Sequence, residues 1–449
     1  MAITNLNIAS DVHIKLALAS LKANYNVNYS WINNTNIYLR DPVRQIRIDA
    51  TAGSYNNSHI IEYIASSVFI HCYNAWSYLS TSLHAFLEGD IGNAIHNAYY
   101  AELRGIMSFL ASQGIGVFNG KNILVEANGD IKIAACSSRE SRTHAFAKLA
   151  LEQWLNEPNN GEKVLRTISS QGISLKSWID ATGFPPGSVL PGKLASSWLA
   201  DWSFDMAIVN DDHDLRNTVS YRPQKFDLSI SRDFDDIKKR ISFLKELWFV
   251  SAPNNLYNDS LLRFSLEFIY KQLGYSSIAN LDINKDLKVL LQDVGMNPNT
   301  PSSSALIKFL RRETFGTDNN MFSRAKNRIP PPVSEFNIDP YGIIARACLL
   351  LQLTTRMADS LIKSSLTSKN ELQFWLEHIG IRMGFWEFGS EPSQFSDLWA
   401  DIIPEIDELE RWSSNTSHIH NQFNFKKSMT AFTKYIKQID RAYLWNLSI

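Results

Sequence analysis

Hydrophobic residues recur every three or four positions along much of the chain, a spacing that places them on one face of an α-helix. The two clearest stripes run over residues 59–87 and 91–112, with Gly89-Asp90 between them. Because this break is so short, the two helices should form an antiparallel hairpin. Similar stripes lie in the stretches 12–21, 137–155, 194–222, 232–250, 260–273, 341–362 and 395–412. The pattern therefore predicts a mainly α-helical fold.

One position on the second stripe is acidic. Glu102 lies seven residues after Ile95 and four before Ile106, so its carboxylate points toward whatever this helix packs on. A buried carboxylate needs a cationic or hydrogen-bonding partner. Two interpretations are open: Glu102 forms a structural ion pair where two helices cross, or it is the acidic member of a polar site between helices.

Two stretches favour strands. Residues 28–53 contain alternating positions and β-forming residues, which predict one or two short strands within an N-terminal segment at 1–57. Residues 122–126 and 131–135 flank Asn128-Gly129, the pair that a type I′ turn favours. We therefore expect a β-hairpin inserted among the helices.

Length and proline content predict several domains. At 449 residues the chain is too long for a typical single domain. Three consecutive prolines, within residues 328–340, impose an extended spacer and mark the clearest boundary. The expected regions are an N-terminal segment at 1–57, a helical domain with the β-hairpin insertion at 58–225, a helical connecting region at 226–327 and a C-terminal helical domain at 341–449.

Composition limits the class of protein. The net charge is −1, so there is no overall positive field, and any nucleic-acid binding would have to be local. The three cysteines, Cys72, Cys136 and Cys348, are far apart, which indicates a reducing compartment and neither a disulfide framework nor a cysteine zinc site. The N-terminus lacks a basic region before its short apolar run, and no apolar run approaches the roughly 20 residues of a membrane span. We expect a cytoplasmic protein without a membrane segment.

The stretch from residue 212 to residue 221 is unusually polar for a predicted helix. Many of its hydrogen-bonding side chains stand three or four positions apart and so share one side of the helix. They are Asp212, His213, Arg216, Asn217, Ser220 and Tyr221. This face is either a solvated helix end or the wall of a pocket. If it lines a pocket with the acidic position described above, Glu102 should face Arg216 or its neighbours.

The stretch GDIGNAIHNAYYAELRGIMSFLA, at residues 89–111, resembles a helix of HEPN-superfamily domains, in which an AYYA-type run follows a glycine-bounded helical hairpin. The resemblance covers residues of about 58–225. The family motif is an arginine, usually followed by a polar residue, with a histidine four to six positions after the arginine. Arg216-Asn217 matches its first half, and Tyr221 stands where the family has histidine. A second pair, Arg139 and His144, has the motif spacing without the asparagine; it is either a binding pair or a surface pair near a helix start.

The resemblance implies a small helical bundle and, for many members, a dimeric metal-independent ribonuclease of a bacterial toxin or antiviral-defence system. Such cleavage needs a base, a cation and an acid. Arg216 could supply the cation, Asn217 a hydrogen bond to the phosphate, and His213 or His144 the proton, with Tyr221 as donor. Glu102, Asp212, Ser220 and Arg139 complete the candidate residues.

The same resemblance allows a second function. Some HEPN-like proteins are non-catalytic and bind a nucleotide or a partner protein of a multi-gene system, and Tyr221 in place of histidine favours this alternative. Other enzyme classes find little support, because the chain has no phosphate-binding glycine loop, HExxH or GxSxG motif. We expect no cofactor and no metal.

Overall fold

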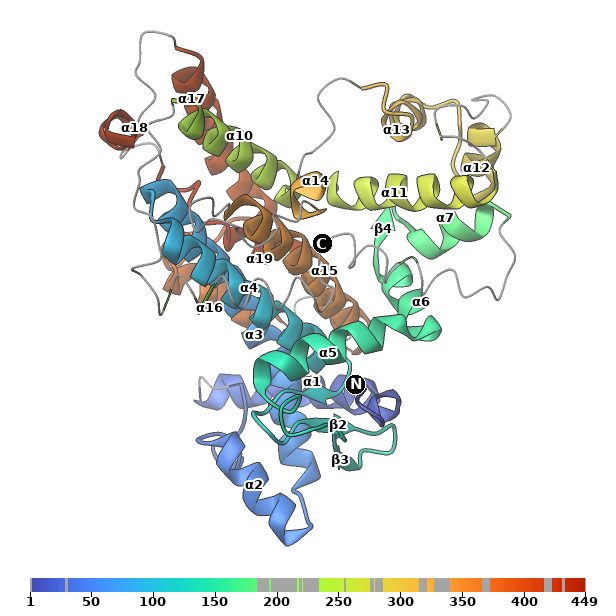
Figure 1. Cartoon of the computed structure of the whole chain (residues 1–449), viewed down its shortest axis with the longest axis vertical. Helices are drawn as coiled ribbons and strands as arrows, with labels where there is room; N and C mark the ends of the chain where they lie inside the picture. Colours follow the sequence, from blue (N-terminus) through green and yellow to red (C-terminus); the bar gives the residue numbers. More distant parts are fainter. Residues whose placement is uncertain are drawn as a thin grey trace.

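The computed structural model describes most of the chain and confirms a mainly α-helical fold (Figure 1). The described residues are 2–28, 31–183, 194, 216–217, 220, 234–253, 256–274, 278, 286–314, 321–326, 340–365, 372–415, 422–429 and 433–448. Within them, no helix is both long and apolar enough to cross a membrane.

The predicted helical hairpin is present. Helices α3 (Asn57–Glu88) and α4 (Ile91–Ser112) pack along each other, and Gly89 separates them with a left-handed φ of 81°. The Asp90 side chain caps α4 by accepting a hydrogen bond from the Asn93 backbone N–H. A glycine that ends one helix and an aspartate that starts the next explain why two residues are enough for the reversal.

Helix α15 (Pro340–Ser365) completes the centre of the molecule. It lies against both α4 and α3, and it is buried along almost its whole length (Figure 1). This helix was expected in a separate C-terminal domain, and it packs against α3 and α4 of the N-terminal half as well as against α10 (Phe234–Ser251), α14 (Met321–Lys326) and α19 (Arg441–Ser448). The reason is that α15 is apolar on nearly all sides, so it needs cover from several neighbours. The boundary expected near residue 225 lies outside the described residues, and so do residues 327–339 of the proline-rich boundary.

The predicted β-hairpin is confirmed, with a different turn. Strands β2 (Ile123–Val125) and β3 (Ile131–Ile133) are antiparallel, and β1 (Ile115–Gly116) adds a third strand beside β2. The Gly129 N–H donates to the Glu126 carbonyl, and only Gly129 of the Asn128-Gly129 pair has a positive φ. A type I′ turn requires a positive φ at both central residues, so this is the longer loop that ends in a glycine bulge.

The prediction of one or two short strands in residues 28–53 is wrong. Helix α2 (Pro42–Ala52) occupies this stretch. Asp41 caps it by accepting from the Arg44 N–H, Pro42 stands in its first turn, and Gly53 ends it with a φ of 71°. These three local features outweigh the alternation on which the strand prediction rested.

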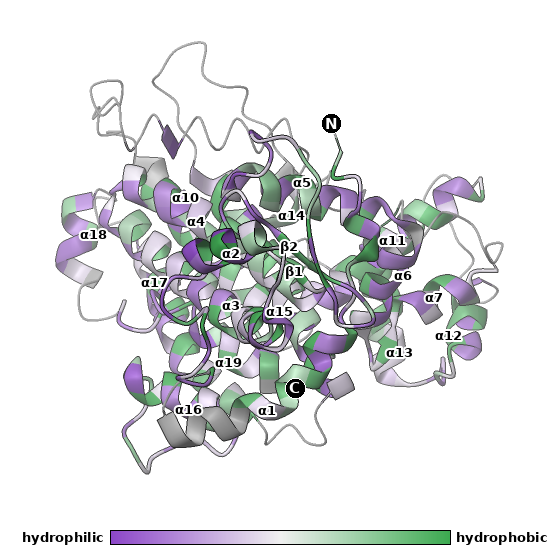
Figure 2. Cartoon of the chain, turned by 90° about the horizontal axis from the view of Figure 1, so that it is seen from below, coloured by the Kyte–Doolittle hydropathy of each residue, from purple (hydrophilic) through white to green (hydrophobic). Residues whose placement is uncertain are grey.

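The other elements surround this centre. Figure 2 shows α3, α4 and α15 in the middle of the molecule, with α17 and α18 on one side and α7 and α12 on the other. The remaining helices before residue 300 are η1 (Leu6–Ile8), α1 (Val12–Asn28), α5 (Thr143–Asn156), α6 (Pro158–Thr167), α7 (Leu175–Ala181), α10 (Phe234–Ser251), α11 (Leu256–Gln272) and α12 (Lys288–Asp293). The later ones are α13 (Pro301–Leu310), α14 (Met321–Lys326), α16 (Gln373–Arg382), η6 (Phe395–Asp401), α17 (Ile402–Ser414), α18 (Gln422–Met429) and α19 (Arg441–Ser448). A second small sheet pairs β4 (Ser169–Ser170) with β5 (Ile173–Ser174).

Gly114 joins α4 to the three-stranded sheet, and its replacement should be costly. It has a left-handed φ of 80°, and a Cβ at this position would lie 2.2 Å from the Ser10 carbonyl oxygen. Gly114→Ala should lower the free energy of unfolding by at least about 3 kcal/mol, since backbone strain and a backbone clash act together. Gly120→Ala is the matched control, because Gly120 also has a positive φ but has open space around its Cβ position. Urea unfolding that shows equal losses for both variants would contradict the clash at Ser10.

Candidate functional site

Three segments that are distant in sequence meet beside the middle of α4. Helix α4 contributes His96, Tyr99 and Tyr100, helix α5 contributes His144 and Lys148, and the helical residues 216, 217 and 220 cover them. Because positions four apart share a helix face, His96 and Tyr100 point together from α4, and so do His144 and Lys148 from α5. We call these residues, with Arg216, Asn217 and Ser220, the tyrosine–histidine cluster.

The floor of the cluster is a buried tyrosine. The Tyr99 ring is fully buried, and its hydroxyl lies 2.8 Å from Nδ1 of His144. The ammonium of Lys148 lies 4.7 Å from the centre of the same ring, and the Lys148 side chain is 5 % exposed. A buried phenol normally has a hydrogen-bond partner, so Tyr99 fixes the orientation of the half-buried His144 ring.

The arginine predicted as the cation of the site is part of this cluster. Arg216 is 8 % exposed, and its guanidinium lies 5.3 Å from the ring centre of Tyr100 and 5.8 Å from that of Tyr99. It donates hydrogen bonds to the Tyr100 hydroxyl and, at 2.8 Å, to Oδ1 of the neighbouring Asn217. Stacking and hydrogen bonding together hold the guanidinium in one position, as its planar fork allows.

A second histidine lies on the other side of Tyr100. The His96 ring centre is 4.9 Å from that of Tyr100, and the His144 ring centre is 6.2 Å from it. His96 also lies 2.8 Å from the Ser220 hydroxyl through Nδ1. Burial and the nearby positive charge of Arg216 lower the pKa of His96 below its ordinary value. His96 is therefore mostly neutral at pH 7, and a neutral imidazole can accept a proton.

Glu102 has an ion-pair partner on another helix of the core. It is 2 % exposed, and its Oε1 lies 3.6 Å from Nε of Arg346 on α15. Glu102 follows Tyr100 by two positions, so the two side chains leave α4 on roughly opposite sides. This contact supports the interpretation of Glu102 as one member of a structural ion pair where two helices cross.

The other predicted site residues have different positions. Arg216, Asn217, Ser220 and His144 are brought together, as described above. Arg139 is exposed in the turn that precedes α5. Asp212, His213 and Tyr221 lie outside the described residues.

Four members of the cluster were not predicted from the sequence: His96, Tyr99, Tyr100 and Lys148. Two spacings could have identified them. His96 and Tyr100 are four apart on α4, and His144 and Lys148 are four apart on α5, which places a histidine and a second polar group on one face in each helix. Tyr99 lies on the apolar stripe of residues 91–112, and a buried phenol signals a nearby polar partner.

The cluster combines proton carriers with cations. Two histidines, two tyrosine hydroxyls, a lysine and an arginine suit the binding of an anion and the transfer of protons around it. Among the described residues, no group of His, Cys, Asp and Glu side chains is arranged to hold a metal ion.

The chain matches no protein-family model, no curated protein and no solved structure.

Proposed function

We propose that this chain acts on RNA and cleaves its phosphodiester bonds without a metal ion, at the tyrosine–histidine cluster. One observation carries the proposal: the ring of Tyr100 adjoins the rings of His96 and His144 and the guanidinium of Arg216. Metal-independent cleavage requires two proton carriers and a cation within reach of one phosphate. The cluster holds all three groups around one aromatic ring.

The proposed reaction assigns a role to each group. Neutral His96 accepts the proton of the 2′-hydroxyl, whose oxygen then attacks the adjacent phosphorus. The bond from phosphorus to the 5′-oxygen breaks, and His144 in its charged form donates a proton to that leaving oxygen. Arg216 stabilises the negative charge of the phosphorane. The products are a 2′,3′-cyclic phosphate and a 5′-hydroxyl, and the two histidines have exchanged protonation states.

The biological setting is proposed from the HEPN resemblance. On that basis the chain is an effector of a bacterial antiviral-defence or toxin-type system, and two copies or a partner protein would act with it in the cytoplasm. Ser220 is exposed, and His96, Tyr100 and His144 are half-buried, so these residues are the ones through which a substrate would meet the cluster.

One observation favours a second function. Arg216 already donates to Asn217 and to the Tyr100 hydroxyl, and it is 8 % exposed. An arginine used in this way can hold a segment in place instead of stabilising a transition state. The cluster would then be a non-catalytic site for a nucleotide or a partner protein.

A cleavage assay with a conservative variant separates the two functions. Arg216→Lys keeps a positive charge at the buried position but loses the planar fork that contacts Tyr100 and Asn217. With single-stranded RNA in the presence of EDTA, we expect cleavage by the wild type and a rate lower by roughly 10²-fold in the variant. Arg411→Lys, on the surface of α17, is the control and should cleave at the wild-type rate. Wild-type protein that binds RNA or a nucleotide and leaves it intact supports the non-catalytic function.

A further inference from the structure

Exposed basic side chains lie on the segments that connect α2, through a loop, to the start of α5. Arg47 lies on α2, Lys121 on the loop between β1 and β2, and Arg139 and Arg142 on the turn that leads into α5; all four are exposed. We call these four residues the basic strip. Arg142 is the residue that precedes the first turn of α5, two positions before His144.

Hydrogen bonds connect the three segments of the basic strip. The Arg47 guanidinium donates to the Asn119 carbonyl at 3.2 Å, which joins α2 to the loop. The Gly120 N–H donates to the Ser141 carbonyl at 2.9 Å, and the Asn122 side-chain amide donates to the same carbonyl at 2.9 Å. These contacts join the loop to the start of α5, so the strip is continuous from α2 to the edge of the cluster.

The charges of the basic strip are not neutralised by ion pairs with other described residues. Elsewhere on the described surface, exposed or half-exposed cations do form such pairs, as Arg166 does with Glu162 and Arg411 with Glu408. The nearest acid in sequence is Glu140, which accepts a hydrogen bond from the Ser137 backbone N–H at 3.0 Å. The four cations therefore carry charge that no ion pair with a described residue neutralises, on a chain whose net charge is −1.

We infer that the basic strip binds the phosphate backbone of a single-stranded RNA whose reacting phosphate lies in the tyrosine–histidine cluster. This inference rests on the proposed function and adds the path of the substrate: from the cluster, past the start of α5 and the loop at 118–121, to α2. Spaced cations that lead into a group of aromatic rings are the arrangement that holds a single strand, since phosphates pair with the cations and bases stack on the rings.

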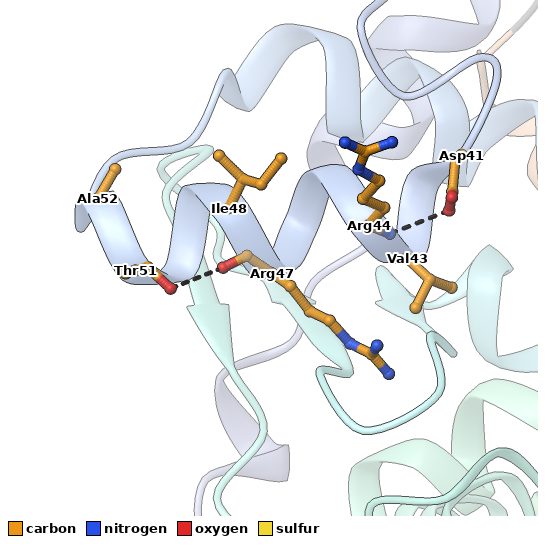
Figure 3. A pocket seen from close by; sticks show the side chains of 7 residues that line it. All are labelled: Asp41, Val43, Arg44, Arg47, Ile48, Thr51 and Ala52. Atoms are coloured by element: carbon orange, nitrogen blue, oxygen red, sulfur yellow. Dashed lines mark hydrogen bonds between the residues drawn. The ribbon is translucent and has the colours of Figure 1, made fainter.

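The two arginines of α2 provide a matched pair for a test. In Figure 3, Arg47 points toward the neighbouring loop, whereas Arg44 leaves the same helix in another direction. Both are exposed and both line the hollow along α2. Charge reversal at Arg47 removes a cation from the strip, and charge reversal at Arg44 makes the same change in charge outside it.

The test is a titration of fluorescently labelled single-stranded RNA with Arg47→Glu, Lys121→Glu and the control Arg44→Glu, against salt concentration. We expect Arg47→Glu and Lys121→Glu each to bind a long oligonucleotide several-fold more weakly, with a salt dependence shallower by about 0.7 in the logarithmic slope per lost contact. The affinity for a dinucleotide, which fills only the cluster, should stay the same. Arg44→Glu should bind both RNAs as the wild type does.

Several results would overturn the path. Equal weakening by Arg44→Glu would show a general effect of charge, and equal weakening for the dinucleotide would show damage to the cluster. Displacement of the RNA by a polyglutamate peptide at equal charge concentration would instead assign the strip to an acidic protein. Failure of the path is distinguishable from failure of the proposed function: cleavage that is unaffected by the strip variants refutes only the path. Strip-dependent binding without any cleavage refutes only the catalytic proposal.

Discussion

Glu102→Ala is expected to lower the free energy of unfolding by about 3–5 kcal/mol, because it removes one member of a buried ion pair. The carboxylate lies 3.6 Å from the Arg346 guanidinium, and the side chains are 3 % and 6 % exposed. Truncation removes the carboxylate that lies against the buried Arg346 guanidinium where α4 and α15 pack together. Urea unfolding followed by circular dichroism measures the loss.

Two controls show whether burial is the cause. In Glu102→Met/Arg346→Met both charges are replaced by apolar groups, and the stability should return to within about 1–2 kcal/mol of the wild type. Glu88 and Lys426 form an ion pair at 2.7 Å with side chains 41 % and 48 % exposed, so Glu88→Ala should cost no more than about 1 kcal/mol. A loss for Glu102→Ala as small as that for Glu88→Ala would contradict a buried pair.

His144→Ala is expected to reduce RNA cleavage by roughly 10²–10⁴-fold, since it removes the proton donor to the leaving oxygen. Stability should change by only about 1–3 kcal/mol, because His144 is half-buried and the substitution removes its hydrogen bond with Tyr99. The exposed His84 of α3 provides the matched control, and His84→Ala should cleave at the wild-type rate. Equal activity of His144→Ala and the wild type would remove His144 from the mechanism.

The pH dependence of cleavage tests the role of His96. Burial and the charge of Arg216 lower the pKa of His96, so its neutral form persists below the ordinary value of 6.5. As the pH falls, the rate should therefore decrease through a pKa below 6.5, and this acidic limb should be absent from the residual activity of His96→Gln. An unchanged acidic limb in that variant would assign the base to another group.

The elements predicted correctly are those that local sequence determines. The hairpin of α3 and α4 follows from two long apolar stripes with Gly89-Asp90 between them, and the sheet follows from two short strands around Asn128-Gly129. Helix α2 was not predicted, because the strand prediction for residues 28–53 rested on alternation alone and left out the capping residues Asp41-Pro42 and Gly53. A prediction based on these helix start and stop signals would have placed a helix here.

Contacts between distant segments were harder to predict. The burial of Glu102 followed from its place on the stripe, but its partner Arg346 is 244 positions later and lies on a helix that was expected to belong to another domain. Arg216 and His144 were selected from motif spacing, and the structure brings them together through Tyr99 and Tyr100. The sequence provides no information about which two faces meet, because many apolar helix faces are interchangeable as packing partners.

The central claim, that the tyrosine–histidine cluster cleaves RNA without a metal ion, is tested most directly by the chemical ends of the products. Single-stranded RNA should be incubated with the purified wild-type chain in EDTA, and the fragments weighed by mass spectrometry. Attack by the 2′-oxygen predicts fragments that end in a 2′,3′-cyclic phosphate, paired with fragments that begin with a 5′-hydroxyl. Intact RNA, or fragments with a 5′-phosphate and a 3′-hydroxyl, would contradict the proposed chemistry.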